Sequence, residues 1–125
     1  MPTWTSDELN KIGKAEELQI ASLRSDDTLQ TRRIVWVVCL GDNLFVRSVN
    51  GLMSAWFRGV QTRHEGHGRA GGVVKDVNFV EEPASNINDQ IDAAYATKYR
   101  RYAASIISHI NGSEARAATI KLLPR

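Results

Sequence analysis

The sequence predicts an α+β fold, a small antiparallel barrel or sheet with helices around it. The chain has 125 residues, 42% of them apolar, which is enough to bury a core without disulfides or a metal. Arg32–Leu40 is the clearest strand, because Ile34–Leu40 is apolar on both faces and rich in β-branched residues. Further short strand-like segments follow between glycine- and asparagine-containing turns, and helix-like segments lie at both ends.

The N-terminal segment predicts a helix followed by a strand. Thr5 and Glu8 are spaced as in a capping box, which satisfies two free N–H groups at a helix start. Gly13 indicates that this helix ends near Lys14. Apolar residues then alternate in part with polar ones, so Glu17–Leu23 is expected to be a strand.

The middle of the chain predicts two hairpins with a helix between them. Gly41-Asp42-Asn43 is a hairpin turn that joins Arg32–Leu40 to a strand over Asn43–Val49. Leu52–Gln61 is expected to be helical, because its apolar residues recur every four positions. A second hairpin joins His64–Ala70 to Val73–Val80 through a Gly71-Gly72 turn.

The C-terminal part predicts one long helix over Asn86–His109, capped at its end by Asn111 and Gly112. Ser113 is expected to be the N-cap of a short helix. A last extended segment covers Ile120–Leu123, so residues 1–125 are expected to form a single domain.

The net charge of +2 conceals four blocks of alternating sign. Residues 1–31 carry −3, residues 32–75 carry +5, residues 76–97 carry −5 and residues 98–125 carry +5. The basic blocks could meet in a positive pocket, or they could neutralise the acidic blocks. We prefer the second interpretation. The basic blocks contain no recognition-helix or RNA-binding pattern, so nucleic acid is not an expected partner.

Composition also suggests where the protein resides. A single cysteine, Cys39, excludes an internal disulfide and a cysteine-rich zinc site. The longest apolar run has seven residues, too few to cross a membrane, and the N-terminus has no signal-peptide pattern. A cytoplasmic protein with no membrane partner is therefore expected.

Several motifs have a structural interpretation that we prefer to a chemical one. Gly66–Gly71 matches the spacing of a dinucleotide-binding loop, but a strand-like segment follows it where that loop needs a helix. His64 and His67 would point to opposite faces of a strand, so no metal site is expected. Cys39 is expected to be a buried structural residue. No residue is predicted to be catalytic.

One cluster of residues could bind an anion with a planar ring. Arg47 and Ser48 end a predicted strand, and Arg58 lies in the helix that follows. A guanidinium and a hydroxyl beside a helix can hold a phosphate. Trp56 lies in the same helix and could contact a ring, although aromatic residues of a small domain more often form its core.

The same region resembles a known superfamily. Its pattern is Thr31-x-x-x-Val35-Trp36-Val37-Val38-x-x-Gly41-Asp42-x-Leu44-Phe45-Val46-Arg47-Ser48-x-x-Gly51. This resembles the core hairpin of the FMN-binding split-barrel superfamily, which includes pyridoxamine-phosphate oxidase-like proteins and deazaflavin-dependent nitroreductases. Over essentially its full length, the chain is more similar still to an uncharacterised bacterial family, domain of unknown function 2255. The segments that carry this likeness are Asp7-Glu8-Leu9, Ala55-Trp56-Phe57-Arg58, Ala70-Gly71-Gly72-Val73, Asp92-Ala93-Ala94-Tyr95-x-x-Lys98-Tyr99 and Glu114–Thr119.

The resemblance implies a split β-barrel, a homodimer and a small-molecule cofactor, FMN or a deazaflavin, at the dimer interface. It implies an oxidoreductase in which Arg47 and Ser48 hold the phosphate. The Ser-x-Lys of flavin-binding relatives is missing, and Arg58 could replace its lysine. The alternative is a non-enzymatic ligand-binding or interaction module that kept the barrel and lost the cofactor. That alternative predicts that, without ligand, Arg47→Ala leaves the dimer and its melting temperature nearly unchanged.

Overall fold

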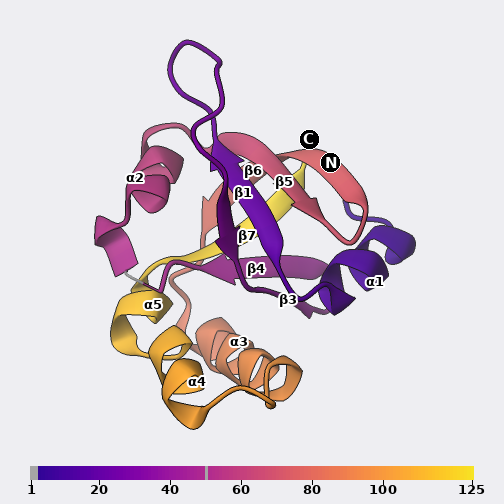
Figure 1. Cartoon of the computed structure of the whole chain (residues 1–125), viewed down its shortest axis with the longest axis vertical. Coiled ribbons are helices and arrows are strands. Elements are labelled where there is room, and N and C mark those ends of the chain that lie inside the picture. The colour runs from indigo at the N-terminus through magenta and orange to yellow at the C-terminus, as the bar shows by residue number, and fades with distance from the viewer. Residues whose placement is uncertain (1–2, 50) are drawn as a thin grey trace.

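The computed structural model describes residues 3–49 and 51–125, in which seven strands form one antiparallel sheet that curls into a nearly closed barrel (Figure 1). The order of strands across the sheet is β2-β1-β5-β6-β7-β4-β3. The strands are β1 (Leu18–Ser22), β2 (Arg33–Val35), β3 (Val37–Leu40), β4 (Asn43–Arg47), β5 (Glu65–Ala70), β6 (Val73–Glu81) and β7 (Thr119–Pro124). The helices are α1 (Ser6–Lys14), the 3₁₀ turn η1 (Gly51–Met53), α2 (Ala55–Thr62), α3 (Ser85–Lys98), α4 (Ala104–Ile110) and α5 (Ser113–Ala117). The α+β barrel expected from the sequence is confirmed.

The barrel closes at Trp36. The sequence predicted one strand over Arg32–Leu40, but this segment forms two strands, β2 and β3, separated by that residue alone. β2 pairs with β1 at one edge of the sheet, and β3 pairs with β4 at the other edge. The Trp36 carbonyl accepts a hydrogen bond from the Tyr95 hydroxyl at 3.1 Å. The Trp36 indole stacks on the ring of Tyr99, with 3.9 Å between the ring centroids. These contacts hold the bend through which the chain passes from one sheet edge to the other.

The predicted hairpins are confirmed. The turns between β3 and β4 and between β5 and β6 contain Gly41, Gly71 and Gly72, all with positive φ. Gly66, in β5, permits a close approach of two strands, because a Cβ there would lie 2.2 Å from the Ala21 carbonyl oxygen. The glycine-rich segment therefore serves the sheet, as we preferred to a nucleotide-binding loop.

α1 begins and ends where the sequence predicts. The Glu8 N–H donates to Thr5 Oγ1 at 3.1 Å, and the Thr5 N–H donates to Glu8 Oε1 at 2.9 Å, which completes the capping box. Just before the helix, the indole of Trp4 is buried and donates to the Leu122 carbonyl at 2.9 Å. This bond ties the N-terminal segment to β7, the last strand.

The prediction of one long helix over Asn86–His109 is wrong. α3 ends at Lys98, and α4 starts at Ala104 after a turn. The side chain of Tyr99 explains the break, because its hydroxyl donates to the Glu16 carbonyl at 2.9 Å and accepts from the Val37 N–H at 3.2 Å. Ser113 is likewise not an N-cap, since α5 is capped by Gly112.

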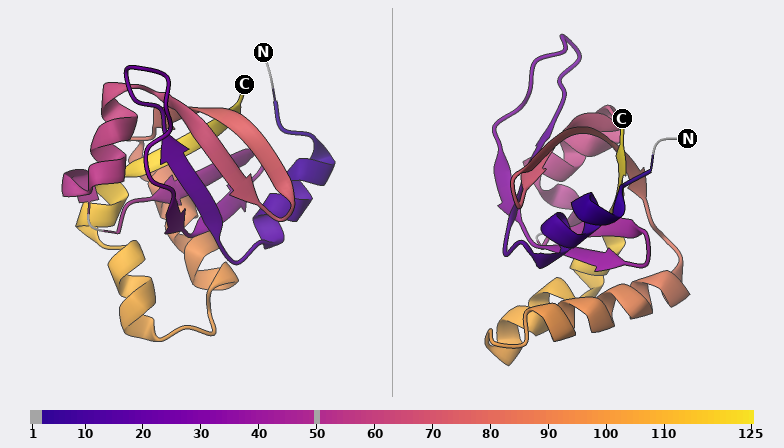
Figure 2. Two further views of the ribbon diagram at one scale, coloured as in Figure 1. Left: turned by 45° about the horizontal axis from the view of Figure 1, so that its top comes forward. Right: turned by 90° about the vertical axis from the view of Figure 1, so that its right-hand side faces the viewer.

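The apolar residues form two layers. One cluster fills the barrel and includes Ile20, Leu44, Phe57, Phe79 and Ile120. The other lies between the outer face of β3 and β4 and the helices α3 and α4, which form a separate layer in Figure 2. It contains Val38, Phe45, Ile91, Tyr95, Tyr99 and Ile110. Within the described ranges, no helix has the length and apolar character needed to span a membrane.

Candidate functional site

A cleft of about 880 Å³ lies where the bend between β2 and β3 meets the end of β4, the start of α2 and the helix α4. This volume is within the range of small-molecule sites. The residues that line it are Glu17, Arg33, Ile34, Val35, Trp36, Arg47, Ser48, Val49, Ser54, Ala55, Trp56, Ser105, Ile106, His109 and Ile110. Five segments of the chain meet there, so only the fold assembles the site.

Two tryptophans give the cleft its aromatic surface. Trp36 is fixed by its stacking on Tyr99. Trp56 contacts Phe57 edge to face, with 6.0 Å between ring centroids, and packs against the barrel core. Both indoles are only partly buried. The cleft therefore offers fixed apolar surface to a flat ligand.

Two exposed side chains of the cleft carry N–H donors. Arg33 and His109 are exposed and come from β2 and the last turn of α4. Neither takes part in an ion pair among the described residues. The carboxylate of Glu17 lies in the same lining. Arg33 and His109 each have an N–H donor available to an anion.

Arg47, by contrast, is a buried structural cation, 1% exposed in the wall of the cleft. Its Nε donates to Thr119 Oγ1 at 2.9 Å, and its Nη2 donates to Asn88 Oδ1 at 2.8 Å and to the Asn88 carbonyl at 3.1 Å. Its Nη1 donates to Asp92 Oδ1 at 2.6 Å, to Asn111 Oδ1 at 3.0 Å and to the Ile110 carbonyl at 3.3 Å. A guanidinium has five N–H donors, so these bonds occupy all of them.

The network continues beyond Arg47. Asp92 also pairs with Arg116, whose other nitrogen lies 3.1 Å from Asp89 Oδ1. These ion pairs join β4, α3 and α5. Removing the guanidinium would leave buried acceptors unpaired, which is costly. The bonds therefore argue against the expectation that Arg47→Ala would leave the melting temperature nearly unchanged.

Three of the four predicted site residues meet at the cleft, namely Arg47, Ser48 and Trp56. The Ser48 hydroxyl is buried and bonds to the Gly51 carbonyl at 2.9 Å and to Ser54 Oγ at 2.7 Å. Arg58 lies on an exposed face of α2 and is not part of the lining. That these residues bind a cofactor stays a prediction.

Sequence reasoning missed Arg33 and His109. Arg33 does lie in a strand and His109 in a helix, as predicted, although both predicted segments are divided in the structure, and nothing in the spacing of the two residues links them. The two consecutive arginines before the apolar strand, Arg32 and Arg33, were the one local signal. Their convergence on the cleft depends on the bend at Trp36 and on the break after α3.

The charge blocks mainly neutralise one another, as expected. Lys75 pairs with Glu8 at 3.1 Å and Arg63 with Asp27 at 2.6 Å, and each pair joins a basic block to an acidic one. The Arg47–Asp92 pair does the same. The expectation of a buried Cys39 is wrong in part, because the thiol is only partly buried. Burial and the nearby Asp42 carboxylate raise its pKa.

The fold resembles solved structures of low sequence identity. An F420 reductase is 12% identical, with a TM-score of 0.56 over 93% of this chain and 90% of that one. The conserved hypothetical protein Rv2991 from Mycobacterium tuberculosis is 9% identical, with a TM-score of 0.58 over 99% and 82%. HutZ, the heme storage protein from Vibrio cholerae, is 12% identical, with a TM-score of 0.58 over 96% and 89%. These neighbours share the split-barrel fold that the sequence led us to expect.

The sequence comparisons give the family. Curated proteins yielded no match. A family model described as "Uncharacterized protein conserved in bacteria (DUF2255)" matches residues 8–122, which is nearly the whole chain. Apart from Asp7, the segments quoted for the resemblance, up to Thr119, fall within this match. The barrel fold and this match together place the chain in the DUF2255 family of uncharacterised bacterial proteins.

Proposed function

We propose that the cleft binds FMN or a deazaflavin and that the protein is an oxidoreductase. The observation that carries this proposal is the pairing of two fixed indoles, Trp36 and Trp56, with the exposed N–H donors of Arg33 and His109 in one cleft. A flat, anionic cofactor complements both features. The name of one structural neighbour, an F420 reductase, supports the same class of ligand.

The side chains divide the recognition between them. Trp56 packs on the ring system, and Arg33 and His109 contact the anionic tail. Ser48 lies in the wall beside Ser54 and orients the end of β4. Arg47 is a positioning residue in this proposal, because its donors are occupied within the chain. The cofactor, when bound, supplies the hydride chemistry, and the protein supplies position and charge.

A second copy of the chain completes the site. Three apolar residues of the lining are exposed at its rim, Ile34 (61%), Val49 (41%) and Ile106 (46%). Met53, which is adjacent in sequence to the lining residue Ser54, is 76% exposed. Exposed apolar residues gathered around a cleft are typical of an interface. A homodimer that covers this rim would also exclude water from a bound ring.

Titration of FMN and of reduced and oxidised deazaflavin tests the ligand, with flavin and tryptophan fluorescence as readouts. Arg33→Gln combined with His109→Gln should weaken binding about tenfold, because one charge-assisted contact and one further hydrogen bond are lost. Arg58→Gln, which also removes one positive charge but lies outside the cleft, should bind as the wild type does. If neither cofactor binds the wild-type dimer, the proposal fails.

Light scattering after size exclusion tests the dimer. Ile34→Glu places a charge on the apolar rim and should shift the protein toward monomer. Val74→Glu is the matched control, because Val74 is 54% exposed on β6 and does not line the cleft. Dissociation by both variants, or by neither, would contradict the proposed interface.

All N–H donors of Arg47 are occupied within the chain, and this favours a second candidate, a ligand-binding or interaction module without cofactor chemistry. A barrel in which Arg47 bonds within the core has one cation fewer for a phosphate. This candidate predicts a stable dimer that binds neither FMN nor deazaflavin. Dimer formation without cofactor binding would therefore choose it over the oxidoreductase.

A further inference from the structure

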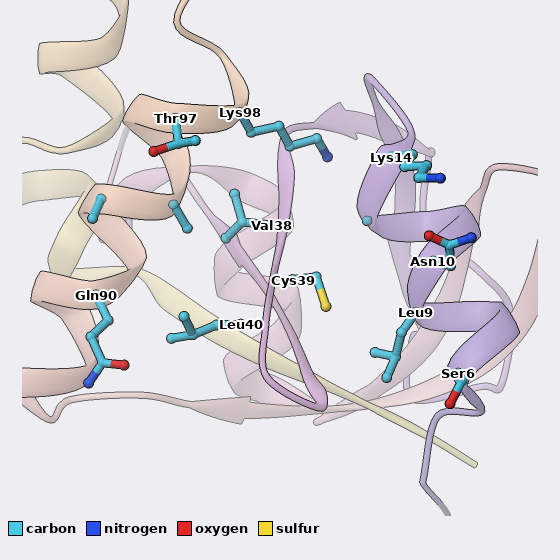
Figure 3. A pocket seen from close by; sticks show the side chains of 13 residues that line it. Ser6, Leu9, Asn10, Lys14, Val38, Cys39, Leu40, Gln90, Thr97 and Lys98 are labelled. Carbon is cyan, nitrogen blue, oxygen red and sulfur yellow. The ribbon is translucent and has the colours of Figure 1, made fainter.

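A second hollow lies on another side of the barrel, between α1 and α3 and over the free edge of β3 (Figure 3). It is a groove of about 820 Å³ that shares no lining residue with the cleft. Each helix contributes residues at positions i, i+3, i+4, i+7 and i+8, which is one face of a helix. The two faces are Ser6, Leu9, Asn10, Gly13 and Lys14 from α1, and Gln90, Ala93, Ala94, Thr97 and Lys98 from α3.

The floor of the groove is the unpaired edge of β3. The Val37 N–H donates to the Tyr99 hydroxyl at 3.2 Å, and its carbonyl accepts from Lys98 Nζ at 2.5 Å, so the peptide groups of Val37 face away from β4. Alternate residues of an antiparallel edge face the same way. The peptide groups of Cys39 therefore face the groove as well. Val38 and Leu40 complete the floor.

Charge is concentrated at one end of the groove. Lys14 and Lys98 occupy the i+8 positions and lie at the same end in Figure 3, whereas Ser6 and Gln90 lie at the other. Among the residues that the structure describes, neither lysine forms an ion pair with a carboxylate. The middle consists of Leu9, Leu40, Ala93 and Ala94.

The surroundings of Lys98 support an anion there. Burial lowers its pKa to about 8, and the carboxylate of Glu16 opposes this shift only in part. Glu16 is itself engaged by Arg101 and Tyr102. Two other carboxylates act on neighbours of Lys98, Asp42 on Cys39 and Glu17 on Tyr99. An ammonium that is partly desolvated and bonded to one carbonyl gains stabilisation from a bound carboxylate.

We propose that this groove binds an amphiphilic monocarboxylate, with the carboxylate between Lys14 and Lys98 and the apolar part along Leu9, Leu40 and Ala93. Residues eight positions apart on a helix are about 12 Å apart along its axis, which sets the length of ligand that fits. A linear aliphatic acid such as octanoate has this form. The site is independent of the proposed cofactor cleft.

Protection of Cys39 from alkylation is a direct readout, because it is the single thiol of the chain and it lines the groove. Octanoate should slow the reaction of Cys39 with N-ethylmaleimide in a saturable way at pH 7. Octylamine, with the same chain and the opposite charge, should protect at least tenfold less well. Equal protection by both, or none by octanoate below its aggregation concentration, would overturn the proposal.

Two pairs of variants locate the ligand. Lys98→Gln should weaken octanoate binding about tenfold, while Lys11→Gln on α1, outside the lining, should not change it.

Ala93→Phe fills the groove and should abolish protection, whereas Ala96→Phe, on an exposed part of α3 outside the lining, should not. Ala93 and Ala96 are exposed, so both phenylalanine variants should fold. Octanoate binding that survives Ala93→Phe would place the ligand elsewhere and refute the site.

Binding should also depend on pH in one direction. The affinity for octanoate should fall as pH rises through about 8, where Lys98 loses its charge. Affinity that stays constant from pH 7 to above 9 would exclude Lys98 as the carboxylate partner.

Discussion

Two cations hold α3 against the barrel, and they do so in different ways. Arg47 is almost completely buried and donates six hydrogen bonds, three of them to Asn88 and Asp92 of α3. Lys98, at the other end of α3, donates one bond to the Val37 carbonyl and remains partly exposed. The comparison indicates that the number of occupied donors decides whether a cation stabilises the fold or is available to a ligand.

The chemistry of the two side chains explains the difference. A guanidinium presents five donors in a rigid plane, so one arginine can satisfy several oxygens from different segments. The Asp92 carboxylate balances its charge. An ammonium has three donors on a flexible chain, and two of those of Lys98 have no partner among the described residues. Arg47 thus belongs to the core, and Lys98 to a surface groove.

The largest expected effect is that of Arg47→Ala. Asp92, Asn88 and Thr119 would lose the group that bonds to all of them. We expect the free energy of unfolding to fall by about 3–5 kcal/mol, as when one partner of a buried ion pair is removed. Urea denaturation followed by circular dichroism measures this change. Arg58→Ala is the control and should stay within about 0.5 kcal/mol of wild type; similar effects of both would break the comparison.

Tyr99→Phe should have an intermediate effect. The hydroxyl donates to the Glu16 carbonyl and accepts from the Val37 N–H, so its loss leaves a buried N–H without a partner. We expect a loss of about 1–3 kcal/mol in the free energy of unfolding. Tyr102→Phe, whose hydroxyl contacts the more exposed Glu16 carboxylate, should cost less. The opposite order would show that the turn after α3 is not held by Tyr99.

Lys98→Gln should have the smallest effect, changing the free energy of unfolding at pH 7 by no more than about 1 kcal/mol. The variant loses one hydrogen bond, but it also removes a partly desolvated charge, and the two effects oppose each other. The pH dependence carries more information. The folded-state pKa of about 8 lies below the ordinary value of lysine, so between these two pH values the unfolded chain binds more protons. The stability of the wild type should therefore rise with pH in that window.

Denaturation of wild type and Lys98→Gln at pH 7 and pH 9 isolates this contribution. The free energy of unfolding of the wild type should increase relative to that of the variant. A constant difference would mean that Lys98 is as solvated as an ordinary surface lysine. Of the two cations, only Arg47 would then combine burial with an ion pair inside the fold.

Local patterns were enough to predict most of the elements. The capping box at Thr5 and Glu8 and the turns at Gly41 and Gly71 depend on residues within a few positions of one another. The errors came where a distant side chain overrides the local pattern. Trp36 interrupts the longest strand because Tyr95 and Tyr99 hold it, and the helix after Lys98 breaks because Tyr99 is bonded to Glu16 and Val37.

The candidate site was predictable only in part, for the same reason. Arg47, Ser48 and Trp56 lie within ten residues, and a resemblance over that stretch was enough to bring them together. Arg33 and His109 are 76 positions apart, and no pattern along the chain joins them. Their shared place at the cleft follows from the bend in the barrel.

By itself, the sequence determined the class of fold, the family and three residues of the cleft, Arg47, Ser48 and Trp56. The physical reason is that strand alternation, turns and capping act over short distances along the chain. Only the tertiary structure decided what each charge does. The availability of a cation depends on which oxygens surround it in space, and those of Arg47 come from α3, β7 and the end of α4.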